Sequence, residues 1–312
     1  MDCGFLIYRV CEDSDMKTDE SKTQEQRKRI AAKQIIAEIE IGNIQKILAN
    51  NGIDVVVLKG PHLSNTVYQR ESNRDYCDLD LLVHPKSFEQ ALRLLEENDY
   101  KRIELSRDRK ATQINFYNYH FRTPGGMSLE LHRYFSQLDR YPLDYSRLIT
   151  EAREFLIGQV RAKGLKPEHL LVHLIIHILK SYFNVKRKHF EDIALVCRNW
   201  EIDWKEVEGL LDFSGAKFGA YFVFKAVDRF HGFRPPEEIM CSLRPGLIRR
   251  IWLNHFIETE LSFVEAEIGR PFGLSQRRLA LPLMDSKRKW IEMSGRYLWL
   301  RIKDLIMSYT PL

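Results

Sequence analysis

The stretch VVLKGPHLSNTVYQRESNRDYCDLDLLVH, residues 56–84, joins two apolar runs through a polar, turn-rich link. The second run carries Asp78 and Asp80 with one apolar residue between them. Because side chains alternate across a strand, these two carboxylates point to one face and Leu79 points to the other. Two carboxylates so close repel each other, and their burial is costly without a counter-charge. The stretch therefore predicts a cation site on a buried strand.

A third carboxylate lies in SLELHRYF, residues 128–135. The turn sequence TPGG at 123–126 predicts a hairpin between strands 114–123 and 127–135, which would place Glu130 beside Asp78 and Asp80. Mg²⁺ prefers oxygen ligands and sits between carboxylates and substrate phosphates. Three carboxylates can hold two ions, the arrangement used for in-line phosphoryl displacement. The alternative is a chance D-x-D pair on a solvated strand.

Composition and charge restrict the class of protein. The chain has 312 residues, 44% hydrophobic and 29% charged, which is globular and favours two domains over one. A net charge of +5 fits a phosphate-bearing ligand without requiring nucleic acid. The five cysteines are scattered and form no CxxC, so we expect neither a disulfide framework nor a zinc knuckle, and a cytoplasmic location. The first residues lack signal-peptide features, and no apolar run is long enough to span a bilayer.

The pattern of elements changes along the chain. Residues 1–30 are a mostly polar segment that leads into a helix. Residues 31–150 contain segments with helical periodicity and segments that are rich in β-branched residues or alternate between apolar and polar residues. The latter predict strands at 53–59, 78–84, 100–105, 114–123 and 127–135. After about residue 150 the pattern changes, and several segments from Lys166 onward show helical periodicity, so residues 151–312 are assigned to a helical domain. We expect an α+β domain with a small mixed sheet, followed by an all-helical domain.

Residues that suit a nucleotide flank the acidic pair. Gly60 at the end of the first strand lets the backbone approach a phosphate, and Lys59 supplies positive charge. Arg74 lies four residues before Asp78. Together with the carboxylates, these are the parts that a nucleoside triphosphate site needs.

A row of histidines marks the segment KPEHLLVHLIIHILKSYF, residues 166–183. His169, His173 and His177 recur every four residues, so they lie near one helix face. Three alternatives are a zinc site, a row lining the nucleotide cleft, and hydrogen-bonded histidines at a domain interface. No cysteine or acid is placed to complete a zinc site, and we expect His173 and His177 to face the cleft.

A basic turn precedes the next predicted helix. Lys188 and its neighbours either bind the triphosphate or form a solvated loop. Asp192 on that helix either pairs with a cation or orients a histidine. The basic, aromatic C-terminal tail could bind RNA, an acidic peptide or a membrane surface, or pack as an ordinary helix.

These motifs occur in a recognisable order: LKG, an arginine before the acidic pair, DLDLLV, LELH, LKPEHLLVHLIIH and FEDIALV. Over roughly residues 50–210 the sequence resembles a family of uncharacterised bacterial nucleotidyltransferases in the DNA polymerase beta superfamily. The resemblance implies a polymerase-beta-like fold in which Asp78, Asp80 and Glu130 are catalytic metal ligands. The wider superfamily has Gly-Gly or Gly-Ser after the first strand. Here Lys-Gly is followed by PHLS, and we expect Lys59 or Ser64 to replace the missing hydroxyl.

The sequence thus predicts a nucleotidyltransferase that depends on two Mg²⁺ ions. We expect it to move a nucleoside monophosphate from an NTP, in our expectation ATP, to an acceptor hydroxyl. The acceptor is a small molecule, a peptide or an RNA end, chosen by a helical domain that closes the cleft. Alternatives are a non-catalytic nucleotide-binding scaffold and a transfer RNA end-modifying enzyme. The predicted nucleotide-binding residues are Lys59, Gly60, Ser64, Arg74, His132, His173, His177, Lys188 and Asp192.

Overall fold

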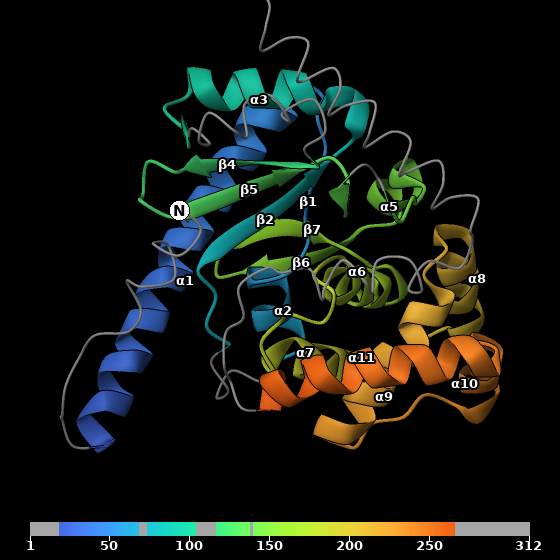
Figure 1. Ribbon diagram of the computed structural model, residues 1–312. Coiled ribbons are helices and arrows are strands. Elements are labelled where there is room, and N and C mark those ends of the chain that lie inside the picture. Colours follow the sequence, from blue (N-terminus) through green and yellow to red (C-terminus); the bar gives the residue numbers. More distant parts are fainter. Residues whose placement is uncertain (1–18, 69–73, 104–116, 138–139, 266–312) are drawn as a thin grey trace, which may run out of the picture.

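A seven-stranded mixed sheet forms the centre of the molecule (Figure 1). The computed structural model describes residues 19–68, 74–103, 117–137 and 140–265. The strand order is β3-β4-β5-β2-β1-β7-β6, where the strands are β1 (Val55–Val57), β2 (Asp78–Val83), β3 (Lys101–Arg102), β4 (Asn118–Arg122), β5 (Ser128–His132), β6 (Arg153–Ile157) and β7 (Val160–Gly164). The pairs β2–β5 and β1–β7 are parallel and the other neighbouring pairs are antiparallel.

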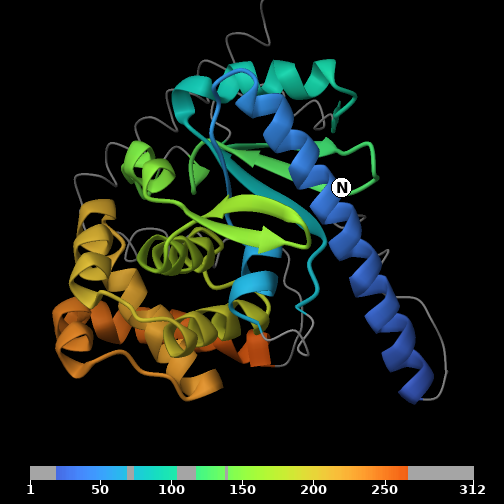
Figure 2. The same ribbon diagram turned by 180° about the vertical axis from the view of Figure 1, so that it is seen from behind.

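Helices α1 (Asp19–Ala49) and α3 (Phe88–Glu97) cover one face of this sheet, and a short 3₁₀ turn, Pro85–Ser87, precedes α3. Figure 2 shows α1 passing over the sheet and continuing beyond it. The alternate β2 residues Leu79, Leu81 and Val83 pack here in a buried core with Ile41 and other apolar residues of α1 and α3. Their alternation therefore leaves Asp78 and Asp80 for the opposite face.

The opposite face lies against a second core built by helices. Val56, Leu58 and Leu82 of the sheet pack into it. Its helices are α2 (Pro61–Thr66), α5 (Tyr145–Thr150), α6 (Pro167–Lys180), α7 (Lys188–Asn199), α8 (Trp204–Ser214), α9 (Lys217–His231), α10 (Glu237–Leu243) and α11 (Leu247–Glu265). Helix α6 is apolar nearly all round and almost wholly buried, so it forms the middle of this layer.

Two expected boundaries differ from the structure. The segment after residue 150 begins with the hairpin β6–β7, which pairs through β7 with β1, so the all-helical part starts only at Pro167. The hairpin was missed because four of the five β6 residues lack full burial and give no clear alternation. Helix α1 begins at Asp19, within the polar segment assigned to residues 1–30, since Glu, Gln, Lys and Arg are good helix formers.

The remaining sequence predictions of secondary structure agree with the described residues, apart from the strand at 100–105. Of that strand only Lys101–Arg102 is seen as β3, and residues 104–105 lie outside the described residues. The first residues of the strand predicted at 114–123 and the tail from Leu279 also lie outside them. Among the described helices, none combines the length and apolar character needed to cross a bilayer. The division into two domains stays a prediction.

Candidate active site

Strand register brings the predicted carboxylates together. In the parallel pair β2–β5, Asp80 stands opposite Glu130, and Asp78 stands opposite Ser128. The predicted hairpin is present as the antiparallel pair β4–β5, which places β5 at the side of β2. Asp80 is fully buried, whereas Asp78 and Glu130 are partly exposed. The sequence prediction that Glu130 lies on a strand beside the D-x-D pair is confirmed.

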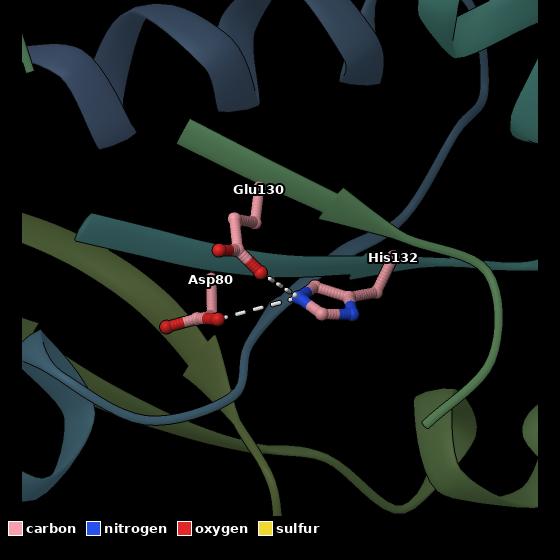
Figure 3. A group of neighbouring side chains, drawn as sticks. All are labelled: Asp80, Glu130 and His132. Atoms are coloured by element: carbon pink, nitrogen blue, oxygen red, sulfur yellow. Dashed lines mark hydrogen bonds and ion pairs between the residues drawn. The ribbon is translucent and has the colours of Figure 1, made fainter. Parts of the chain in front are cut away.

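His132 lies between two of these carboxylates (Figure 3). Its Nε2 atom is 3.2 Å from Oδ1 of Asp80 and 3.3 Å from Oε2 of Glu130. The donor atoms of the three residues lie within 4.8 Å of one another, which is close enough for one metal ion to bind them all. Asn118 on β4 donates a hydrogen bond from Nδ2 to the same Oε2 atom, at 2.8 Å. Asp80, Glu130 and His132 are therefore held in fixed positions on one sheet face.

Lys59 supplies the positive charge nearest to Asp80. Its Nζ atom is 3.2 Å from Oδ2 of Asp80, on the side away from His132. The backbone N–H of Leu58 donates to the carbonyl of Asp80 at 2.9 Å, which fixes the end of β1 beside β2. The buried Asp80 thus meets a lysine through one carboxylate oxygen and a histidine through the other.

The charges shift the acidity of the carboxylates in opposite directions. The nearby charge of Asp80, helped by burial, raises the pKa of Asp78 to about 6. Burial works against ionisation of Asp80, but Lys59 and His132 outweigh it and lower the pKa of this carboxyl. Burial likewise opposes ionisation of Glu130, and hydrogen bonding to His132 lowers its pKa overall. A site with this excess of carboxylates favours added positive charge.

Gly60 and Ser64 lie at the start of α2, directly after Lys59. Gly60 has φ 54° and ψ −106°, a conformation that side chains oppose, and an added Cβ would lie 3.3 Å from the carbonyl oxygen of Asp78. Ser64 is half-buried one turn into the helix, where its N–H donates to the carbonyl of Gly60 at 3.0 Å. The backbone at Gly60 therefore approaches the strand that carries the carboxylates.

Arg74 forms an ion pair with Asp192. Its Nε and Nη2 atoms each lie 2.7 Å from a different oxygen of Asp192 on α7, and the residue is buried. The hydroxyl of Tyr68 donates to Oδ1 of the same carboxylate at 2.8 Å. Two nitrogens of Arg74 are thus bound to Asp192, and the role of Arg74 in binding the phosphates stays a prediction. Of the two alternatives for Asp192, the structure shows the pairing with a cation.

Two histidines of α6, His173 and His177, have pKa values that favour the neutral ring. Burial, with smaller effects of neighbouring positive charges, lowers the pKa of His173 and of His177 well below the usual value. The ring of His173 packs edge-on against Phe135 at 4.3 Å, and the ring of His177 stacks on His189 at 5.0 Å. The charge of Lys59, which contacts Asp80, contributes to the pKa shift of both His173 and His177.

His169, one turn earlier on α6, lies elsewhere. Its Nε2 atom is 3.7 Å from oxygens of Glu151 and Glu206. Lys166 occupies the same group, with its Nζ atom 2.5 Å from Glu151 and 2.7 Å from Glu206. These carboxylates already have a cation, and His169 takes no part in the site on the sheet.

Lys188 stands at the start of α7 with an exposed side chain. Its charge is among those that lower the pKa of Asp78. Partial desolvation of its amino group by the surrounding protein, with the charge of Arg74, lowers the pKa of Lys188 itself. It is the member of the basic turn that the structure brings toward the acidic pair.

Two neighbours of Glu130 were missed from the sequence. Asn118 and His120 lie on β4, where His120 pairs with Glu130 and its Nδ1 is 3.6 Å from Oε1 of that residue. Both belong to the alternation of NYHFR, with Tyr119 and Phe121 on the other face. Once the β4–β5 hairpin is predicted, this alternation places Asn118 and His120 on the same face as Glu130. It is therefore the sequence signal from which both neighbours could have been predicted. Tyr68 had no comparable signal, because its partner lies 124 residues away.

Three solved structures are among those similar to this chain. The lincosamide antibiotic adenylyltransferase LnuA, bound to lincomycin, is 12% identical, with 51% of this chain and 95% of that chain covered and a TM-score of 0.34. The antibiotic-resistance factor ANT(2'')-Ia is 14% identical, with 64% of this chain and 98% of that chain covered and a TM-score of 0.40. An antigenic nucleotidyltransferase-like protein from Paracoccidioides brasiliensis is 16% identical, with 66% of this chain and 91% of that chain covered and a TM-score of 0.35. These likenesses are distant. No curated protein matches the chain significantly.

The family comparison covers most of the chain. A family described as uncharacterised nucleotidyltransferase matches residues 6–230, a range that contains the whole sheet, α6, α7 and the cluster of Asp80, Glu130 and His132. The chain therefore belongs to this family of nucleotidyltransferases and is an enzyme of that class.

Proposed function

We propose that the chain transfers a nucleoside monophosphate, AMP from ATP, to an acceptor hydroxyl and releases pyrophosphate. One observation carries the proposal: Asp80 and Glu130 stand opposite each other on neighbouring strands, with Asp78 two residues away. Three carboxylates on one sheet face are a donor set suited to Mg²⁺ and to the two-ion form of phosphoryl displacement. Membership of the family supports the reaction class.

In this proposal the carboxylates divide the work. Asp78 and Asp80 would hold the ion that accompanies the nucleotide phosphates, and Glu130 with Asp80 would hold the ion on the acceptor side. When bound, such ions stabilise the charge that develops on phosphate oxygens and lower the pKa of an acceptor hydroxyl. The acceptor oxygen forms a bond to the α-phosphorus while the bond from that phosphorus to the bridging oxygen breaks. Pyrophosphate leaves with the electron pair, and the hydroxyl proton passes by way of Glu130 to solvent.

The basic residues act on the phosphates. Lys59 lies 3.2 Å from Asp80 and Lys188 is close enough to lower the pKa of Asp78, so both charges face the place where a triphosphate would meet the carboxylates. The backbone at Gly60, which has no side chain to block approach, completes this side. We assign Arg74 and Asp192 a positioning role, because each binds the other. We propose that His173, which is buried, and His177, which is partly buried, line the nucleotide cleft, since the charge of Lys59 helps to lower the pKa of both.

Two labelled forms of ATP test the reaction type. The full chain with Mg²⁺ and fractionated cell extract is supplied with ATP labelled either at the α-phosphate or at the γ-phosphate. The proposal expects label in a product only from the α-labelled form, with pyrophosphate released in equal amount. Transfer of the γ-label would indicate a kinase. Saturable ATP binding with no transfer to any fraction would instead favour the non-catalytic alternative.

A further inference from the structure

We infer that His132 is a metal ligand, so that one ion position combines Asp80 Oδ1, Glu130 Oε2 and His132 Nε2. We further infer that this position binds a first-row transition metal such as Co²⁺ or Zn²⁺ more tightly than Mg²⁺. The inference deepens the proposed function and rests on it, because it concerns the ion on the Glu130 side. The ion beside Asp78 and the nucleotide phosphates would still meet oxygen donors alone.

The distances match a shared ion. His132 Nε2 lies 3.2 Å from the Asp80 oxygen and 3.3 Å from the Glu130 oxygen. Ligand atoms about 2.0–2.2 Å from an ion lie about 3 Å apart when they occupy neighbouring coordination positions. The three donors can therefore take up an ion with little movement of the side chains.

The backbone fixes the ring in this place. Glu130 and His132 are two residues apart on β5, so they share a face, and register sets Asp80 opposite Glu130. His132 is only 2% exposed, which separates it from a chance surface histidine. Among the described residues, its Nδ1 atom has no hydrogen-bond partner. The two carboxylates are thus the groups that orient the ring.

Donor chemistry then sets the preference among ions. Mg²⁺ binds oxygen ligands, and replacing one carboxylate by an imidazole gains little for it. Imidazole nitrogen suits Zn²⁺, Co²⁺ and their neighbours, whose affinity for mixed nitrogen and oxygen sites exceeds that of harder ions. Lys59 stays on the other oxygen of Asp80, at 3.2 Å, and leaves Oδ1 to the shared position.

Metal binding by the full chain, stripped with EDTA and free of nucleotide, tests the inference. Pulsed electron paramagnetic resonance of the Mn²⁺-loaded protein should show nitrogen coupling from a coordinated imidazole. His132→Gln should abolish the coupling and weaken Co²⁺ binding at least about tenfold, with Mg²⁺ binding changed by less than about threefold. His120→Gln is the matched control, since His120 also contacts Glu130 but stands outside the three-residue cluster. It should keep the coupling.

Several results would overturn the assignment. These are Mn²⁺ bound without nitrogen coupling, coupling that survives His132→Gln, and equal loss of Co²⁺ and Mg²⁺ affinity. The last would mean that His132 only holds the two carboxylates in place. If His132→Gln fails to fold, spectra of His120→Gln and His173→Gln decide. Coupling kept in both assigns the nitrogen to His132, and coupling lost in either removes that assignment.

The test separates this inference from the proposed function. Transfer of the α-label by a protein whose Mn²⁺ shows no nitrogen coupling would refute the imidazole ligand alone. Nitrogen coupling in a protein that transfers no label would refute the nucleotidyl transfer and leave the ligand assignment in place.

Discussion

Arg74 and Asp192 form a buried ion pair through two parallel contacts of 2.7 Å, between residues 118 positions apart in the chain. The pair ties the segment that leads into β2 to helix α7. Since Asp78 follows Arg74 by four residues, the ion pair also fixes where the D-x-D strand begins. The carboxylates on the sheet and the helical layer are thus joined by charge as well as by apolar packing.

Asp192→Asn should destabilise the protein by about 3–5 kcal/mol, because it leaves the Arg74 guanidinium buried without a counter-charge. Arg74→Met with Asp192→Leu should recover most of that loss, since an apolar pair of similar volume replaces two buried charges. Urea denaturation of the single and double variants measures both. A loss below about 1 kcal/mol in Asp192→Asn would show that the pair does not fasten α7 to the segment before β2.

The buried side chain of His62 should make the stability of the protein depend on pH. Burial lowers the pKa of His62 to about 3 in the folded protein, from the ordinary 6.5 of an unfolded chain. The folded state thus disfavours the protonated ring. The contribution of the neutral His62 ring to the free energy of unfolding is therefore complete above pH 6.5. It falls as the pH decreases toward 3, by up to about 1.4 kcal/mol per pH unit for one proton.

The variant His62→Phe keeps a ring beside Phe155, which lies 4.6 Å from His62, and removes the titration. Free energies of unfolding measured from pH 8 to pH 4 should fall less steeply in the variant than in the natural chain. Parallel curves over this range would contradict the assignment of a buried, neutral His62.

Gly60 and Gly52 form a matched pair for the conformation beside the carboxylates. Both have positive φ, 54° and 69°, but only at Gly60 would a Cβ meet neighbours, at Asp78 and Tyr76. Gly52→Ala should cost about 1–2 kcal/mol from backbone conformation alone. Gly60→Ala should cost more and also reduce label transfer, because Lys59 and Asp78 are displaced. Equal losses of stability with unchanged transfer in both variants would refute the close approach at Gly60.

Variants of Glu130 and Lys188 should affect different quantities, the first the rate of transfer and the second the affinity for ATP. Glu130→Gln should bind ATP with near-normal affinity but lose about a hundredfold or more in transfer rate, because the group acts mainly in the transition state. Lys188→Ala should weaken ATP binding by about 1.5–3 kcal/mol, the scale of a lost charge-assisted hydrogen bond. Calorimetric titration with Ca²⁺ in place of Mg²⁺ measures affinity without turnover. Lys186→Ala, at another exposed lysine of the same turn, is the control.

The reverse pattern would contradict these two roles. If Glu130→Gln lost ATP binding while Lys188→Ala kept it, Glu130 would belong to the nucleotide side and Lys188 to solvent.

The strand pattern predicted the centre of the site well. Alternation in DLDLLV and LELH, with a turn at TPGG, predicted the two strands and the β4–β5 hairpin, because strand periodicity and hairpin formation are local properties. The parallel pairing of β2 with β5, which sets Asp80 opposite Glu130, is a long-range contact that the sequence pattern allowed but did not require. The register also puts His132 next to both carboxylates, whereas the sequence analysis named it only as a nucleotide-binding residue.

Long-range partners were beyond the sequence. The partner of a buried charge depends on tertiary packing. The sequence around Arg74 therefore does not indicate that the counter-charge of Arg74 lies on α7 and not on a phosphate. The hairpin β6–β7 was hidden for another reason: its exposed residues, such as Arg153 and Glu154, weaken the apolar alternation. Its turn at Gly158, with φ 56°, was the remaining local signal.

Transfer of the α-phosphate label by the natural chain and by Asp78→Asn tests the central claim most directly. Asp78 is partly buried next to the charge of Asp80, so removing its own charge should leave the metal-free protein at least as stable as before. We predict that Asp78→Asn folds with equal or higher stability and loses at least about a hundredfold in label transfer. Transfer at the natural rate by the folded variant would contradict the claim that these carboxylates carry the reaction.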